Sequence, residues 1–156
     1  MTAIVLRADV PSFERAAVHV LVEGSDVRGL SDADARRLFP GSSLTGARLN
    51  RLRNWPRVVV RIDDAVAGVA TYTQTPFEMQ IPDFAVSIPS AIGAGRSGLA
   101  QRALNELLHA VEVASLAGGC HRIVLIPSAG AADLERRSYL GAREGCAGAW
   151  MEKSLG

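Results

Sequence analysis

The sequence predicts one α/β domain over residues 1–156, with a mixed, mostly antiparallel sheet, a central βαβ unit and helices on both faces. A long helical pattern at 98–117 lies between two apolar segments, 84–88 and 122–126. Strands that are joined by one crossover helix run parallel in the same sheet. A hairpin pattern at 57–74 adds antiparallel strands ahead of this unit, so the whole is a layered α/β fold.

The composition fits a folded protein without a strong overall charge. The chain has 156 residues, 48% of them hydrophobic and 21% charged, which is enough for one sizeable core. Its formal net charge of +1 gives no global field that favours nucleic acid or membrane as a partner, and we expect neither. Cys120 and Cys146 make no disulfide framework, so we expect both reduced. The apolar run at 3–6 is too short for a signal peptide, and we expect a cytoplasmic protein.

The first third of the sequence carries one predicted strand and three predicted helices. β-branched residues predict a strand at 2–6. A helix is predicted over 11–24, because proline and serine suit its first turn and its apolar residues share one face. Acids followed by basic residues predict a short helix that starts at Ser31 and breaks at Pro40. A further helical turn or two covers 47–53.

The middle of the sequence predicts a hairpin followed by a third strand. Asp63 and Asp64 form the turn between two strands rich in β-branched residues. Residues 78–88 predict the third strand, with 84–88 as its best-defined part. Pro82 interrupts this strand, and a proline there implies an edge, a bulge or a late start.

The long helix has a clear apolar face and an N-terminus suited to an anion. Leu99, Ala103, Leu107 and Val111 recur every four residues. Ser97 is the predicted N-cap, and a glycine pair after the helix supplies a left-handed residue to end it. The first-turn N–H groups lack intrahelical partners and the helix dipole is positive there, so this end can bind a phosphate.

The end of the sequence predicts two further strands and one helix. Residues 122–126 form a near-continuous apolar run, which is typical of a central strand. A short helix at 131–140, closed by Gly141, precedes a final strand at 149–155. That last strand could pair across a homodimer.

Three glycines before the long helix, Gly93, Gly95 and Gly98, fit the dinucleotide-binding pattern G-x-G-x-x-G. A Rossmann fold also needs an acid at the end of the next strand, about 20 residues further on, to hold the ribose. That position falls near Glu112, inside the helix, and the next strand ends at Ile126 without an acid. A dinucleotide-binding oxidoreductase is therefore the less well supported alternative.

The order of the elements and the residues at the helix start resemble the GCN5-related N-acetyltransferase (GNAT) superfamily, over nearly the whole chain. The family's signature is Gln/Arg-x-x-Gly-x-Gly/Ala, and Gly98 and Ala100 match its glycine and glycine/alanine positions. Gly95 stands where glutamine or arginine is usual, with Arg96 beside it. Residues 139–142 look like the family's Tyr-x-x-x-Gly-Phe segment.

This resemblance implies an N-acetyltransferase that moves the acetyl group of acetyl-CoA to a primary amine of a small molecule or peptide. The amine attacks directly in a ternary complex, without a covalent enzyme intermediate. The implied pyrophosphate site is the start of the long helix: Gly95, Arg96, Ser97, Gly98, Leu99 and Ala100. The pantetheine arm runs along the preceding strand, at Val86 and Ile88. Ser128 either donates to the cofactor or simply ends a strand.

The resemblance also implies two candidate catalytic residues. Asp83 is the carboxylate on the strand before the loop, and Tyr139 is the tyrosine near the helix after strand 122–126. Arg137 occupies the family's usual tyrosine position. The alternatives are that Asp83 is a solvated residue and that Tyr139 packs. A non-catalytic acyl-CoA-binding or sensor module on the same fold therefore stays open.

The acceptor pocket would be built from residues 24–55 and 73–82. A run of arginines surrounds Trp55 there and would either guide an acidic acceptor or form a solvated helix face. These arginines are Arg48, Arg51, Arg53 and Arg57. No spacing of histidine and cysteine fits a zinc site, so no metal is expected.

Overall fold

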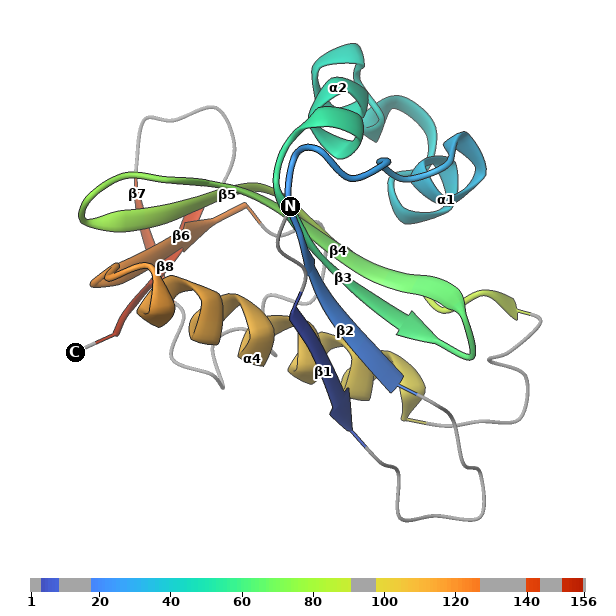
Figure 1. Ribbon diagram of the computed structural model, residues 1–156. Coiled ribbons are helices and arrows are strands. Elements are labelled where there is room, and N and C mark those ends of the chain that lie inside the picture. The colour runs from blue at the N-terminus through green and yellow to red at the C-terminus, as the bar shows by residue number, and fades with distance from the viewer. Residues whose placement is uncertain (1–3, 9–17, 91–97, 127–139, 144–149, 156) are drawn as a thin grey trace.

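The computed structural model describes residues 4–8, 18–90, 98–126, 140–143 and 150–155 (Figure 1). Its strands and helices, in chain order, are β1 (Ile4–Ala8), β2 (Val18–Glu23), α1 (Asp32–Leu38), the 3-10 turn η1 (Gly41–Ser43), α2 (Gly46–Asn54), β3 (Arg57–Ile62), β4 (Ala65–Gln74), β5 (Glu78–Val86), α4 (Leu99–Ala117), β6 (Arg122–Leu125), β7 (Leu140–Arg143) and β8 (Trp150–Ser154).

The described strands form one sheet of eight in the order β1-β2-β3-β4-β5-β6-β8-β7. β5 and β6 run parallel, and the other neighbouring strands are antiparallel. α4 connects the parallel pair, so β5, α4 and β6 are the predicted βαβ unit. The prediction of a mixed, mostly antiparallel sheet is confirmed.

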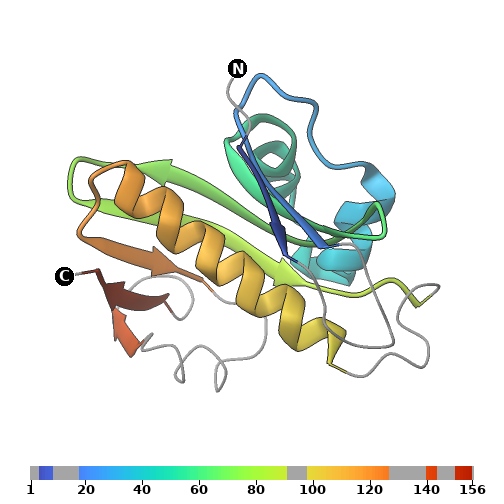
Figure 2. The ribbon, with the colours of Figure 1, turned by 60° about the horizontal axis from the view of Figure 1, so that its bottom comes forward.

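Helices cover both faces of the sheet, as predicted. α4 lies across one face, where it contacts β2 to β6, and α1 and α2 lie over the other (Figures 1 and 2). Alternate side chains of β3 pack on opposite faces of the sheet. Val58 and Val60 belong to the core beneath α4. Val59 packs on the other face, with Leu38 of α1 and Leu52 of α2. No helix in the described part of the chain is long and apolar enough to cross a membrane.

The predicted helix over 11–24 is wrong for its second half. Residues 18–23 form β2, which pairs antiparallel with both β1 and β3. Val18 and Val20 are buried at a spacing of two, which is the period of a strand. Valine is β-branched and favours strands, so the pairing available on both sides outweighs the helical pattern. Residues 9–17 lie outside the described part of the chain.

The two short helices of the first third and the hairpin are confirmed. Ser31 caps α1 by accepting from the Asp34 N–H, and Thr45 caps α2. Asp63 and Asp64 turn the β3–β4 hairpin with φ of 49° and 69°, a left-handed pair that matches the twist of a tight hairpin.

Pro82 lies at a bulge. The β4–β5 register moves from Thr71 opposite Asp83 to Thr73 opposite Gln80, so β5 carries one extra residue there. Proline fits because a bulge leaves a residue unpaired and needs no N–H from it. The parallel pairing with β6 covers 78–81, not the predicted 84–88, and it ends just before this bulge.

The ends of the later elements differ partly from the prediction. The capping position of α4 is Gly98, with φ of 85° and no side-chain cap bond, instead of Ser97, which lies outside the described residues. Gly119, with φ of 79°, is the left-handed residue expected after the helix. Leu140 begins β7 instead of ending a helix, and residues 131–139 of that predicted helix are outside the described part. The final strand is confirmed as β8.

Candidate functional site

The last residues of β5 present an open edge in the described structure. The Ser87 N–H donates to the Ala67 carbonyl of β4 at 2.8 Å. Because the direction of bonding alternates along an antiparallel strand, the N–H and C=O of Val86 face the other edge. On that edge the pairing with β6 stops where the Ile126 N–H donates to the Ile81 carbonyl at 3.0 Å. Backbone groups of β5 beyond this point can therefore pair with an extended ligand.

Of the two predicted pantetheine contacts, Val86 is the last residue of β5 at this edge, and Ile88 lies two residues beyond the end of the strand. Both side chains are partly buried against the core beneath α4, which leaves their backbone as the polar surface. Ile88 follows Val86 in the same alternation and precedes Pro89, which favours extended backbone.

The start of α4 provides a seat for an anion. The first helical bond runs from the Arg102 N–H to the Gly98 carbonyl at 3.0 Å, so the N–H groups of Leu99, Ala100 and Gln101 have no intrahelical acceptor. No described atom lies within 4 Å of the place where a Cβ on Gly98 would stand. Leu99 is buried and Ala100 exposed, so the helix is anchored while its first turn faces outward. These features fit the pyrophosphate of a coenzyme.

Six of the predicted site residues lie in β5, just beyond it or at the start of α4, and the other five fall outside the described residues. The six are Asp83, Val86, Ile88, Gly98, Leu99 and Ala100. The five that lie outside the described residues are Gly95, Arg96, Ser97, Ser128 and Tyr139.

Asp83 is fully buried, and its carboxylate makes four hydrogen bonds. Oδ1 accepts from Arg48 Nε at 2.8 Å and from Arg51 Nη2 at 2.8 Å. Oδ2 accepts from Arg51 Nε at 2.7 Å and from the Thr71 hydroxyl at 2.5 Å. Burial alone would raise the pKa of Asp83, but the bonds from Arg51, Thr71 and Arg48 outweigh it and hold the pKa below its ordinary value.

This environment does not suit Asp83 to take a proton from the acceptor amine, which is the catalytic role open to the carboxylate that the resemblance implies. The side chain is 0% exposed and its oxygens already accept from three residues, so it has neither access to an amine nor a spare acceptor position. Asp83 instead ties α2 to β4 and β5 beside the bulge. The sequence offers one signal for this contact, because Arg48 and Arg51 are three apart and share a helix face.

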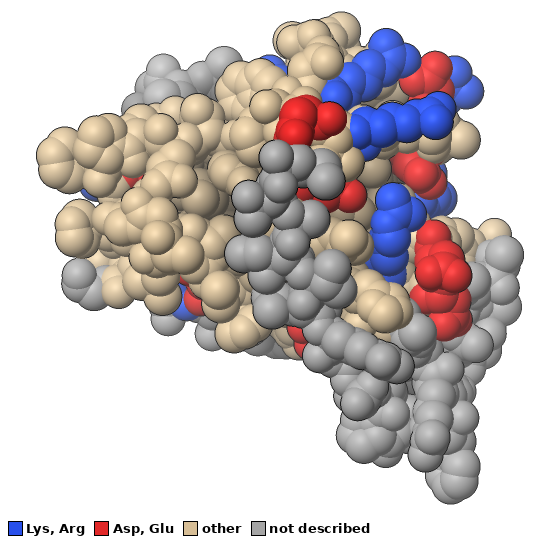
Figure 3. All heavy atoms as spheres, in the orientation of Figure 1, with Lys and Arg blue, Asp and Glu red and all other residues tan. Residues whose placement is uncertain are grey.

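The arginines around Trp55 are mostly internal to the fold. Arg57 is fully buried, where its Nε donates to Glu23 at 3.1 Å and its Nη1 to the Trp55 carbonyl at 2.6 Å. Arg51 also lies over the Trp55 ring, 5.9 Å from the centroid. Arg53 is the exposed member, and it pairs with Asp32. Figure 3 shows Lys and Arg side chains gathered over the α1–α2 layer, with acids among them.

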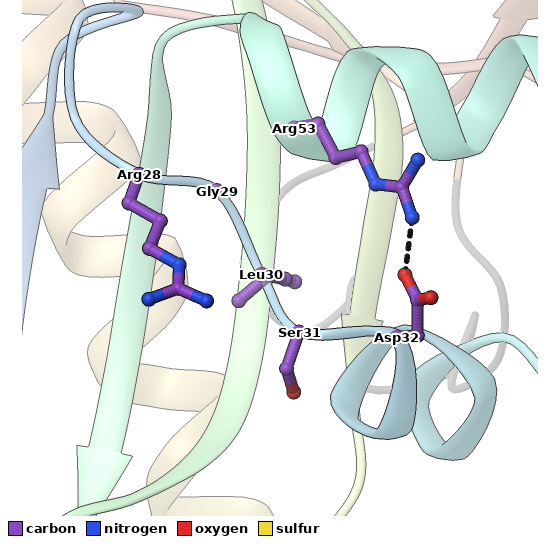
Figure 4. Close-up of a pocket in the computed structure, with 6 residues that line it drawn as sticks. All are labelled: Arg28, Gly29, Leu30, Ser31, Asp32 and Arg53. Atoms are coloured by element: carbon purple, nitrogen blue, oxygen red, sulfur yellow. Dashed lines mark hydrogen bonds and ion pairs between the residues drawn. The ribbon is translucent and has the colours of Figure 1, made fainter.

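One surface hollow lies within the segments predicted to build the acceptor pocket, and a second overlaps them. The first, of about 460 Å³, is lined by residues 28–32 and Arg53, and Figure 4 shows the Arg53–Asp32 pair at its rim. The second, of about 400 Å³, is lined by Trp55, Pro56 and residues 72–74. In the described part of the chain, no three His, Cys, Asp or Glu side chains are grouped closely enough to hold a metal.

No protein-family model matches this sequence, and no curated protein sequence matches it. Solved structures do share its fold. A GNAT family acetyltransferase from Elizabethkingia anophelis with acetyl-CoA bound superposes with a TM-score of 0.57 at 10% identity, over 88% of this chain and 98% of that one. The GNAT domain of S. lividans PAT gives 0.57 at 18% identity, over 96% and 97%.

N-acetylglutamate synthase from Neisseria gonorrhoeae, complexed with coenzyme A and N-acetyl-glutamate, gives a TM-score of 0.59 at 15% identity. The match covers 89% of this chain but only 35% of the synthase, so the chain corresponds to about a third of that protein. At these identities the likeness establishes the fold.

Proposed function

The chain has the GNAT acyl-CoA N-acyltransferase fold, and from this premise we propose that it is an acetyl-CoA-dependent N-acetyltransferase. The acceptor in this proposal is a primary amine of a small molecule or peptide, which attacks directly in a ternary complex. A small-molecule acceptor is supported by the synthase of the same fold that was solved with N-acetyl-glutamate.

One observation carries the proposal: the open strand edge at residues 86–88 is followed closely in the sequence by a helix N-terminus, at residues 98–101, that can bind an anion. The first-turn N–H groups of α4, which have no intrahelical acceptor, suit the pyrophosphate, and the backbone of Val86 and of the following Ile88 suits the amides of the pantetheine arm. Acetyl-CoA has both groups, and no metal is needed to hold it. When bound, it supplies an acetyl group already activated as a thioester.

The chain's own residues would then bind acetyl-CoA and supply a proton to the departing thiol. Gly98, Leu99 and Ala100 would donate from the backbone, and we extend this set to Gly95, Arg96, Ser97 and Ser128 from the resemblance. Tyr139 is our candidate for returning a proton to the departing thiol. Because Asp83 is sealed by Arg48 and Arg51, the attacking amine would lose its proton to water.

The burial of Asp83 also supports a second candidate function, a non-catalytic acyl-CoA-binding or sensor module. Such a module needs the pyrophosphate seat and the strand edge but no proton acceptor. The two functions share the donor site and differ only in turnover.

Two measurements test the proposal. Calorimetric titration with acetyl-CoA should give saturable binding, and nicotinamide dinucleotides should give none. Release of free thiol is then followed with a panel of amines that includes amino acids, polyamines and peptide N-termini. Thiol release that depends on one class of amine supports the transferase, whereas tight binding without thiol release across the panel supports the sensor. Absence of acetyl-CoA binding would refute both.

A further inference from the structure

Arg37 of α1 crosses from the helical layer to the ends of two strands. Its Nη1 donates to the Ser87 carbonyl, just beyond β5, at 2.5 Å, and its Nη2 donates to the Val66 carbonyl of β4 at 2.5 Å. Nη2 also donates to Asp34 Oδ1 at 3.0 Å. The guanidinium thus bridges two main-chain carbonyls that are 21 residues apart in sequence, counted from Val66 to Ser87.

The contact to Ser87 lies next to an irregularity in the sheet. The β3–β4 register places Val60 opposite Gly68 and Arg61 opposite Val66, so Ala67 is the extra residue of a bulge. The Ser87 N–H still reaches the Ala67 carbonyl at 2.8 Å. The Ser87 carbonyl accepts from Arg37 instead of making the return bond that a regular antiparallel pair would add.

Ser87 lies between Val86, whose backbone faces the open edge of β5, and Ile88, which precedes Pro89 and is therefore at a position that favours extended backbone. With its N–H and its carbonyl both held on the β4 side, Ser87 cannot turn either group outward. The alternation then requires its two neighbours to direct their polar groups to the opposite edge. A side chain on α1 therefore sets the direction of the backbone groups that would meet the donor.

We propose that Arg37 is a positioning residue for the pantetheine arm of the acyl donor, acting through Ser87 on the backbone of Val86 and Ile88. This inference rests on the proposed function. Arginine suits the task because its planar fork presents two N–H directions at once, and the Asp34 carboxylate, itself held by the Ser31 hydroxyl at 3.0 Å, fixes its orientation. Lysine has the same charge, but its compact ammonium lacks the planar fork and would bind the Val66 and Ser87 carbonyls together less well.

The test compares two ligands that differ only in the part that Arg37 governs. CoA contains pantetheine, whereas 3′-phosphoadenosine 5′-diphosphate keeps the nucleotide and the pyrophosphate but lacks pantetheine. Affinities for both are measured by calorimetry on the full chain and on the variants Arg37→Ala, Arg37→Lys and Arg36→Ala. Arg36 is the matched control, because it is an exposed arginine on the same helix. Thermal unfolding with each ligand checks that every variant is folded.

Arg37→Ala should weaken CoA about tenfold, as expected for the loss of charge-assisted hydrogen bonds, and leave the pantetheine-free ligand within about twofold. Arg37→Lys should fall between Arg37→Ala and the native chain, and it replaces Arg37→Ala in the test if that variant does not fold. Arg36→Ala should match the native chain. Unchanged CoA affinity, or equal losses for both ligands, would overturn the positioning role alone. A native chain that does not bind CoA would instead overturn the proposed function, and the positioning role with it.

Discussion

Arg51 holds Asp83 at two points, with Nε 2.7 Å from Oδ2 and Nη2 2.8 Å from Oδ1. The carboxylate is fully buried, and the pKa of Arg51 is raised, chiefly by its hydrogen bond to Asp83. A two-point pair of this kind fixes direction as well as distance. It locks α2 onto the sheet at the bulge of β5, next to the strand edge proposed to bind the donor.

Asp83→Asn should therefore lower stability more than it lowers turnover. The amide keeps the size of the side chain but removes the charge that faces Arg48 and Arg51, at a cost of about 1.5–3 kcal/mol in the free energy of unfolding, the range for hydrogen bonds to charged groups. Urea unfolding measures this loss, and acetyl-transfer assays on the folded variant should show kcat within about threefold, because Asp83 does not touch the amine in our proposal.

The exposed pair between Arg53 and Asp32 is the control for Asp83→Asn. Both side chains are about half exposed, at 47% and 52%, so Asp32→Asn should cost less than about 0.5 kcal/mol. If Asp83→Asn were as mild as this control in stability but abolished turnover, Asp83 would be a base after all.

The Asp83 pair also gives stability a predictable dependence on pH. A carboxyl whose folded pKa lies below its unfolded value adds stability that is complete above the unfolded pKa, here 3.8, and is lost as the pH falls through the folded pKa. The difference in unfolding free energy between the native chain and Asp83→Asn should thus stay constant from about pH 5 to pH 8 and shrink below about pH 4. Denaturant titrations at a series of pH values measure it, and a difference that grows in acid would contradict the assigned direction.

Arg57 and Glu23 form a second buried ion pair, and replacing only one of the two residues should destabilise the fold. Arg57→Leu would leave Glu23 charged and 8% exposed, and would also strip the donor from the Trp55 carbonyl. We expect a loss of about 3 kcal/mol or more. Replacing both residues by leucine should recover part of that loss, because no uncompensated charge remains. A double variant that is less stable than either single variant would show that the pair itself is strongly net stabilising.

Most of the fold could be predicted because its signals are local. The α4 stripe, the Asp63-Asp64 turn and the cap at Ser31 each depend on residues within a few positions of one another. β2 could not, since Ala16, Ala17, Val20 and Leu21 have the spacing of one face of a helix. Its pairing with β1 and β3 decides the matter, and that pairing joins distant parts of the sequence.

The candidate site was predictable only where its chemistry is carried by the backbone. Gly98 and the first turn of α4 follow from glycine placement and helix geometry. The assignment of Asp83 could not be settled, because its partners Arg48, Arg51 and Thr71 lie 35, 32 and 12 positions away. The sequence shows that Asp83 follows Pro82, but it does not show that α2 packs against this carboxylate.

Gly98 provides a prediction that separates backbone strain from loss of the anion seat. With φ of 85° it lies in the left-handed region, where valine is strained by about 1–3 kcal/mol, whereas asparagine is tolerated. Gly98→Val should lose both stability and acetyl-CoA affinity. Gly98→Asn should nearly keep its melting temperature but still bind acetyl-CoA at least about tenfold more weakly, because its side chain would stand beside the first turn, where no described atom lies within 4 Å of the Cβ position. Melting curves and calorimetry on the two variants measure the two effects separately. If Gly98→Asn bound acetyl-CoA as tightly as the native chain, the pyrophosphate could not lie against this turn.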